Sequence, residues 1–190
     1  MACAPIELAP ANLAVAIDRA TCWAEHALEA PGRAKLDGVW WLSTHLATVD
    51  RVLHPAARRA LQGVGAIVAE QRRRARAITQ QLWAVEHALS GDGRIRALTA
   101  ADLRLLAEQV RDYALAENRL VEMLEHLLPA DELDRLHQRY VKGLRRAPTR
   151  PHPVLVQSPA LAAAAFRVEG VVDHARDVLD GRSRPRPLAG

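Results

Sequence analysis

Three side chains capable of chemistry fall on the apolar stripes of predicted helices. His45 lies on the stripe of a helix predicted over about 34–61, and Glu117 lies near the centre of the stripe of another predicted over about 99–128, with Tyr113 one turn earlier. A helical wheel at about 100° per residue turns all three side chains toward the core. A carboxylate in that position is costly unless it is paired, hydrogen-bonded or metal-bound.

Two interpretations of these residues remain open. Asp50 lies at the edge of the stripe that holds His45, whereas His54 is predicted on the far side of the same helix. Imidazole, tyrosinate and carboxylate are donors that suit iron, so His45, Tyr113 and Glu117, with Asp50 at the margin, form a candidate site for one metal ion. The alternative needs no metal: Glu117 bonds His45, and the Tyr113 hydroxyl closes a buried hydrogen-bonded cluster.

The elements that must position these residues are long helices. Ala, Leu and Val dominate the hydrophobic 49% of the chain, aromatics make up only 4%, and this bias favours helix. Proline and glycine punctuation divides the sequence into periodic segments at about 10–30, 34–61, 66–89 and 99–128, with a short helix at 130–144. The third of these is predicted to turn inward Val64, Ile67, Gln71, Ala75, Ile78, Leu82, Val85 and Leu89. Thr99, with Asp102 three residues later, is a good N-cap for the next.

Long helices joined by short loops fold back on one another as neighbours. We therefore predict an all-α protein built on an antiparallel up-down-up-down four-helix bundle. The bundle is assigned to residues 1–146, including the short helix at 130–144. A proline-rich linker follows at 147–157, and residues 158–190 form an amphipathic helix that docks on the bundle and a frayed tail.

Parts of the sequence resemble a known family. The run STHLATVDRVLHP from Ser43 to Pro55 resembles the second helix of hemerythrin-like (HHE cation-binding) domains, in which a His is followed four residues later by a Glu. The segment YALAENRL from Tyr113 resembles their fourth helix, and PTRPHP at 148–153 resembles the C-terminal extension of some bacterial members. The resemblance implies a two-iron bundle that binds dioxygen, nitric oxide or a related small ligand, or that stores or senses iron.

The chain departs from the family pattern at several ligand positions. His45 matches the second-helix His, but Val49 stands at the position of its partner Glu, leaving Asp50 one residue on. Tyr113 stands where the fourth-helix His would be, whereas Glu117 keeps the carboxylate. An ordinary two-iron site is therefore not expected: either one iron is held by His45, Tyr113 and Glu117 with Asp50, or the protein is a metal-free regulatory or protein-interaction module. No catalytic residue is predicted.

The charge of the chain bears on whether it binds nucleic acid. The formal net charge is +4 and the basic residues are almost all arginine, including a run at Arg72, Arg73 and Arg74. The run lacks a helix-turn-helix pattern and interleaved aromatics, so a solvated helix face is favoured over a nucleic-acid interface.

Cys3 and Cys22 give no disulfide framework, and the sequence holds neither a signal peptide nor an apolar stretch of about 18 residues. A cytoplasmic protein without a membrane span is expected.

Overall fold

The computed structural model describes residues 33–89, 98–151, 172, 173 and 177. Their regular secondary structure is α-helix, which confirms the all-α prediction for this part of the chain. Its helices are α2 (Arg33–Arg51), α3 (Leu53–Ala60), α4 (Gly65–Leu89), α5 (Ala100–Leu127) and α6 (Ala130–Leu144). The helix predicted at about 10–30 lies outside the described residues. So does most of the predicted C-terminal helix, of which residues 172, 173 and 177 are described and helical.

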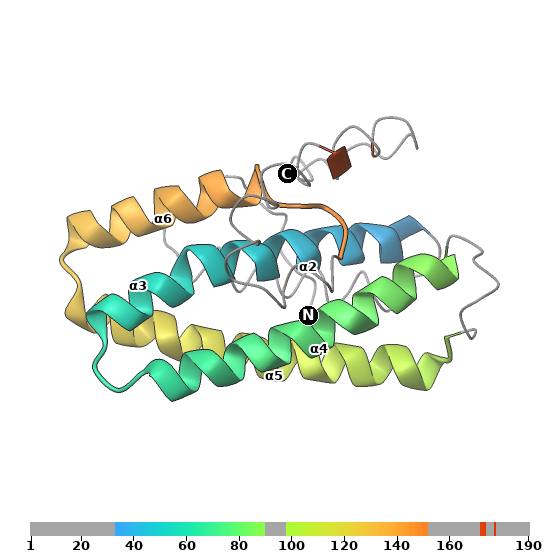
Figure 1. Cartoon of the computed structure of the whole chain (residues 1–190), viewed down its shortest axis with the longest axis horizontal. Helices are drawn as coiled ribbons and strands as arrows, with labels where there is room; N and C mark the ends of the chain where they lie inside the picture. Colours follow the sequence, from blue (N-terminus) through green and yellow to red (C-terminus); the bar gives the residue numbers. More distant parts are fainter. Residues whose placement is uncertain (1–32, 90–97, 152–171, 174–176, 178–190) are drawn as a thin grey trace.

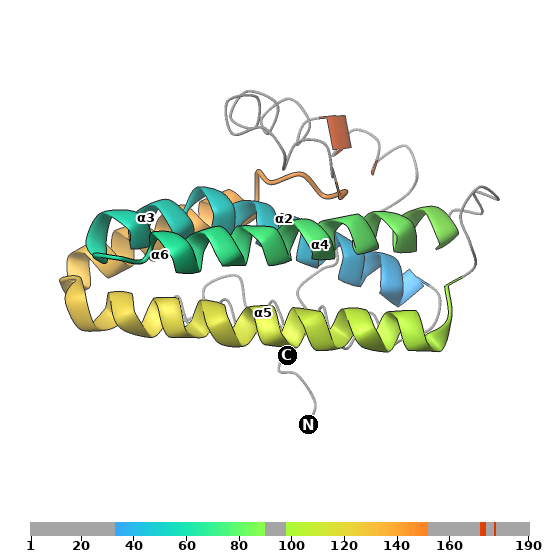
Figure 2. The same ribbon diagram turned by 60° about the horizontal axis from the view of Figure 1, so that its bottom comes forward.

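The described helices pack side by side around a shared interior. In Figure 1, α2 and α3 follow one another, α4 and α5 run alongside them, and α6 runs beside α2 and α3 on the other side. The turned view of Figure 2 keeps α4 next to α5, so this neighbourhood does not depend on the viewpoint. Among the described helices, none has both the length and the apolar content to cross a bilayer.

A break at Val52 divides the single helix predicted over about 34–61 into α2 and α3. Pro55 explains the break, because a proline has no N–H to donate to the carbonyl four residues earlier, and its ring crowds that carbonyl. The carbonyl in question belongs to Arg51, the last residue of α2. The chain resumes as α3 at Leu53.

The start of α5 has the predicted cap. The Asp102 backbone N–H donates to Thr99 Oγ1 at 3.2 Å, and the Thr99 N–H donates to Asp102 Oδ2 at 2.8 Å. This reciprocal capping box satisfies donors that an uncapped helix leaves open. The other end of α5 lies at Leu127, just before Pro129, which begins the turn into α6.

Buried side chains on α4 follow alternating steps of three and four residues. The residues that keep this spacing are Val68, Gln71, Ala75, Ile78, Leu82 and Val85, preceded by Val64 just before the helix, and Thr79 and Glu86 are buried beside them. The predicted inner face is wrong at Ile67 and Leu89, which are 46% and 39% exposed. Ile67 falls out of the alternating spacing, so Val68 takes the inward position, and Leu89 is the last residue of the helix.

The interior contains two apolar clusters. One joins the end of α2, α3, the start of α4, the second half of α5 and α6, and it includes Leu53, Leu124 and Tyr140. The other joins α2, α4 and the first half of α5, and it includes Leu42 and Tyr113. Tyr140 belongs to the first cluster and Tyr113 to the second. A side chain that contacts both tyrosine rings therefore lies at the junction of the two clusters.

Candidate functional site

His45 occupies that junction. Its side chain is fully buried, and its ring meets those of Tyr113 and Tyr140 edge to face, with centroid separations of 6.4 and 6.2 Å. Nε2 lies 2.9 Å from Oε2 of Glu117, which is also fully buried. The prediction that α2 and α5 turn these two residues inward is therefore confirmed.

Tyr140 of α6 completes the bonding of the imidazole. Its hydroxyl lies 2.8 Å from His45 Nδ1. A carboxylate only accepts hydrogen bonds, so His45 Nε2–H donates to Glu117, and in the neutral ring Nδ1 accepts from the Tyr140 hydroxyl. The result is a directed chain of hydrogen bonds across three helices.

Tyr140 is not among the candidate residues predicted from the sequence, because those candidates come from the apolar stripes of the longer helices. A signal is present: Leu133, Leu136 and Tyr140 recur at three and four residues on the short helix at 130–144, as buried positions do. Leu136 and Tyr140 are in fact buried. An inward stripe on this helix could therefore have indicated that it belongs to the core.

Tyr113 lies in the same cluster but is bonded differently. It is fully buried, and its hydroxyl has no hydrogen-bond partner of normal geometry among the described residues; the same is true of Glu117 Oε1. Burial raises the pKa of Tyr113 well above its ordinary value of 10.0, and the nearby Glu117 carboxylate raises it further. Burial and the Glu117 charge raise the pKa of Tyr140 in the same direction. The folded protein thus favours the neutral phenol at both positions.

We expect removal of the hydroxyl to affect the free energy of unfolding differently at the two tyrosines. Tyr140→Phe should lower the free energy of unfolding by about 1 kcal/mol, because it removes a buried hydrogen bond and leaves His45 Nδ1 without its partner. Tyr113→Phe should leave stability within about 0.5 kcal/mol of the wild type or raise it, because it removes a buried hydroxyl that makes no hydrogen bond of normal geometry. Urea denaturation followed by circular dichroism measures both, and equal losses would contradict the assigned bonding.

The alkaline titration of the protein should report this cluster alone, since Tyr113 and Tyr140 are its only tyrosines. Both folded-state pKa values lie above the unfolded value, so their contribution to stability is complete below about pH 10 and falls as the pH rises beyond it. Phenolate absorbance should therefore grow only together with the loss of helical circular dichroism. Phenolate formation in a protein that keeps its helical signal would refute the burial of these hydroxyls.

Asp50 makes no described hydrogen bond to a member of the cluster. Its Oδ1 accepts from Arg72 Nε at 2.5 Å and lies 3.2 Å from His54 Nδ1, and its side chain is 41% exposed. Burial acts to raise the pKa of Asp50, but the hydrogen bonds and positive charges of His54 and Arg72 outweigh it, so the pKa lies below 3.8.

The prediction that His54 faces outward is wrong, because its side chain is fully buried. Thr44 and Thr48 are also fully buried, so this stretch of chain is covered on more than one face, and His54 is buried with them.

The arginine run on α4 is engaged within the protein. Arg72 bonds Asp50, while Arg73 and Arg74 both donate to Glu70, at 2.5 and 2.9 Å. Exposed pairs of this kind contribute little to stability. They do hold the guanidinium groups against carboxylates, which reduces the positive charge that this face presents.

A second polar cluster joins the segment after α6 to the described residues of the C-terminal helix. The backbone N–H groups of Thr149 and Arg150 each donate to Asp173 Oδ2 at 3.1 Å, and the Thr149 hydroxyl donates to Asp177 at 2.6 Å. Arg150 also lies 3.5 Å from Glu86 on α4. Residues 147–149 are buried, so the beginning of the predicted linker packs against the helices.

The geometry thus separates the four residues proposed from the sequence. His45, Glu117 and Tyr113 come together with Tyr140, whereas Asp50 bonds a different pair of residues. No family model, curated protein or solved structure matches the chain.

Proposed function

We propose that this protein is a hemerythrin-like, antiparallel four-helix bundle that works without iron, as a cytoplasmic, non-catalytic regulatory or interaction module. The observation that carries the proposal is the bonding of His45. Both of its ring nitrogens are used within the protein, one by Glu117 and one by Tyr140. These two bonds satisfy the buried imidazole without a metal.

The donor set also does not fit a two-iron centre. Such centres in helical bundles draw carboxylates and histidines from all the helices. Here the carboxylate of Asp50 is committed to Arg72 and His54. Within the described parts of the chain, no three His, Cys, Asp or Glu side chains are grouped closely enough to hold a metal ion.

Metal analysis of the freshly purified full-length chain tests the proposal. The expected result is substoichiometric iron, with an unchanged melting temperature after dialysis against a chelator and after Fe(II) loading in air. Near-stoichiometric iron that survives gel filtration would overturn it. A parallel sample of Glu117→Ala, which removes the carboxylate, shows how much iron binds to the surface alone.

A single-cation site is the alternative, and one observation favours it. Tyr113 Oη and Glu117 Oε1 are both buried and both lack a hydrogen-bond partner among the described residues. They and His45 could hold one cation, with dioxygen or nitric oxide as the small ligand if that cation is iron, but His45 would have to give up one of its present bonds. This alternative expects a tyrosinate-to-iron absorption band that is lost in Tyr113→Phe and kept in Tyr140→Phe.

A further inference from the structure

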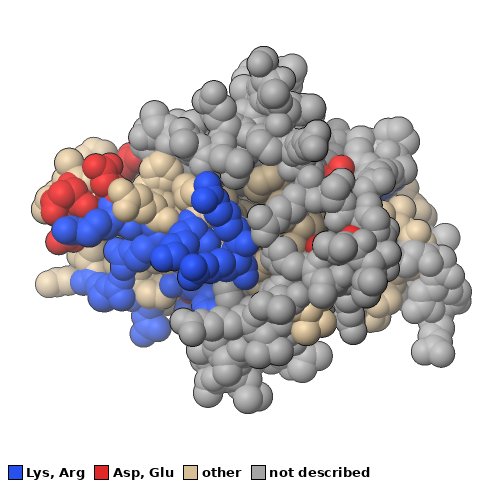
Figure 3. Space-filling view, turned by 90° about the horizontal axis from the view of Figure 1, so that it is seen from above, with Lys and Arg blue, Asp and Glu red and all other residues tan. Residues whose placement is uncertain are grey.

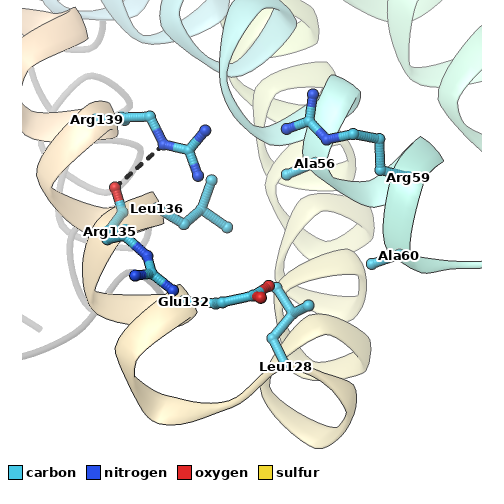
Figure 4. Close-up of a pocket in the computed structure, with 8 residues that line it drawn as sticks. All are labelled: Ala56, Arg59, Ala60, Leu128, Glu132, Arg135, Leu136 and Arg139. Atoms are coloured by element: carbon cyan, nitrogen blue, oxygen red, sulfur yellow. Dashed lines mark hydrogen bonds between the residues drawn. The ribbon is translucent and has the colours of Figure 1, made fainter.

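A pocket of about 500 Å³ opens between α3 and α6, at the end of the protein where α5 turns into α6. It shares no residue with the buried histidine cluster. Its lining consists of Ala56, Arg59, Ala60, Leu128, Glu132, Arg135, Leu136 and Arg139 (Figure 4). This volume lies within the range of roughly 300–1,000 Å³ typical of small-molecule sites, and it exceeds what a simple ion needs.

Two guanidinium groups at this pocket have no acidic partner among the described residues. Arg59 on α3 and Arg139 on α6 lie on opposite sides of the opening in Figure 4, and both are exposed. Arg139 uses only Nε within the protein, donating to the carbonyl of Arg135 at 3.2 Å, so its terminal nitrogens stay available. Arg135, in contrast, pairs with Asp131 at 2.6 Å.

The surface around the pocket is also rich in positive charge. Figure 3, which looks onto the face that carries α6, shows Lys and Arg side chains gathered in one area, with a group of acidic side chains at one end of it and a few more elsewhere on the face. Acidic residues lie in the first turn of α6, at Asp131 and Glu132, and Lys142 lies in its last turn. An anion approaching this face is therefore drawn toward Arg59 and Arg139 and away from Asp131 and Glu132 at the start of α6.

The floor of the pocket is apolar. Ala56 and Leu136 are buried, and Ala60 and Leu128 are half-buried. Glu132 reaches toward Leu128 at the end of the pocket away from Arg59 and Arg139 (Figure 4). One end of the pocket thus suits a negative charge, and the apolar floor suits a hydrophobic group attached to it.

We propose that this pocket binds a phosphomonoester that carries an apolar group, with the phosphate between Arg59 and Arg139 and the apolar group on Ala56 and Leu136. A phosphomonoester is nearly dianionic at neutral pH and offers three acceptor oxygens, enough for two guanidinium groups. A carboxylate has only two oxygens and one charge. This proposal is independent of the metal content of the histidine cluster.

Phenyl phosphate is the probe, titrated into the full-length protein at physiological salt and followed by calorimetry or by amide chemical shifts. Saturable binding is expected, tighter than that of inorganic phosphate, which lacks the apolar group, and of benzoate, which lacks the second charge. If inorganic phosphate bound as tightly as phenyl phosphate, or if phenyl phosphate showed no saturable binding, the proposal would be wrong.

Single variants locate the site. Arg59→Gln and Arg139→Gln should each weaken phenyl phosphate binding by about ten- to a hundredfold, because each removes charge-assisted hydrogen bonds. Arg58→Gln is the matched control, since Arg58 is also exposed on α3 but does not line the pocket. Glu132→Gln should bind at least as tightly as the wild type. Equal losses in Arg58→Gln and Arg59→Gln would indicate diffuse attraction by the surface and would overturn the assigned site.

The phosphomonoester could be a free small molecule or a lipid headgroup, and sedimentation with vesicles separates these sources. Phosphatidic acid carries the same headgroup chemistry on a membrane. If phenyl phosphate binds but phosphatidylcholine vesicles containing phosphatidic acid do not retain the protein, a free ligand is supported. Arg59-dependent retention on those vesicles, with none on phosphatidylcholine alone, supports a lipid headgroup. Arg59-dependent retention on DNA without phenyl phosphate binding would refute the proposal.

Discussion

Replacement of His45 by alanine is expected to lower the free energy of unfolding by about 3–5 kcal/mol, the range found when one partner of a buried pair is removed. The variant leaves Glu117 fully buried without its donor and leaves the Tyr140 hydroxyl without its acceptor. It also opens a cavity at the junction of the two apolar clusters. Urea denaturation monitored by circular dichroism, in the presence of a chelator, measures the loss.

A double-mutant cycle separates the contribution of the hydrogen bond between His45 and Glu117 from the cost of the cavity. Because His45 and Glu117 bond each other directly, the combined His45→Ala and Glu117→Ala variant should be less destabilised than the sum of the single variants. His87→Ala is the control, since His87 lies near the surface and its hydrogen bond is to the backbone carbonyl of Trp83. Strictly additive losses would show that the hydrogen bond contributes nothing beyond the packing of each side chain.

Gly143→Ala is expected to destabilise the protein by about 1–2 kcal/mol, although alanine is the better helix former. At Gly143, α6 approaches α2 so closely that an added Cβ would lie 2.7 Å from Cγ2 of Thr48. The Thr48 side chain cannot easily move, because it is buried and its hydroxyl donates to the Thr44 carbonyl at 2.7 Å. The cost is therefore displacement of α6, and with it of Tyr140, which thermal unfolding would detect.

Thr48→Ser tests the cause, since serine keeps the hydroxyl and removes the methyl group that the added Cβ would meet. Combined with Gly143→Ala, it should restore most of the lost stability. Gly65→Ala is the matched control, because nothing lies within 4 Å of its added Cβ. If Gly65→Ala were as destabilising as Gly143→Ala, close contact between α2 and α6 would not be the reason.

The helical period explains why the sequence predicts which side chains face the interior. His45 and Glu117 lie in phase with aliphatic neighbours on their own helices, so local spacing is enough to place both side chains inward. Thr99 and Asp102 are recognisable as a cap for the same reason, because the capping box is complete within four residues. His54 is misplaced because the prediction allows this stretch only one covered face, whereas Thr44, Thr48 and His54 are all fully buried.

The sequence by itself determined that this chain is helical, where most of the described helices begin and end, and that His45, Tyr113 and Glu117 face inward. Only the tertiary structure decided which polar groups meet. His45 bonds residues 72 and 95 positions away, and Asp50 pairs with Arg72 on another helix. Periodicity fixes the direction of a side chain about its own helix axis, but the rotation and approach of two helices depend on packing along their whole contact. For that reason the inward histidine could be foreseen, and its tyrosine partner on α6 could not.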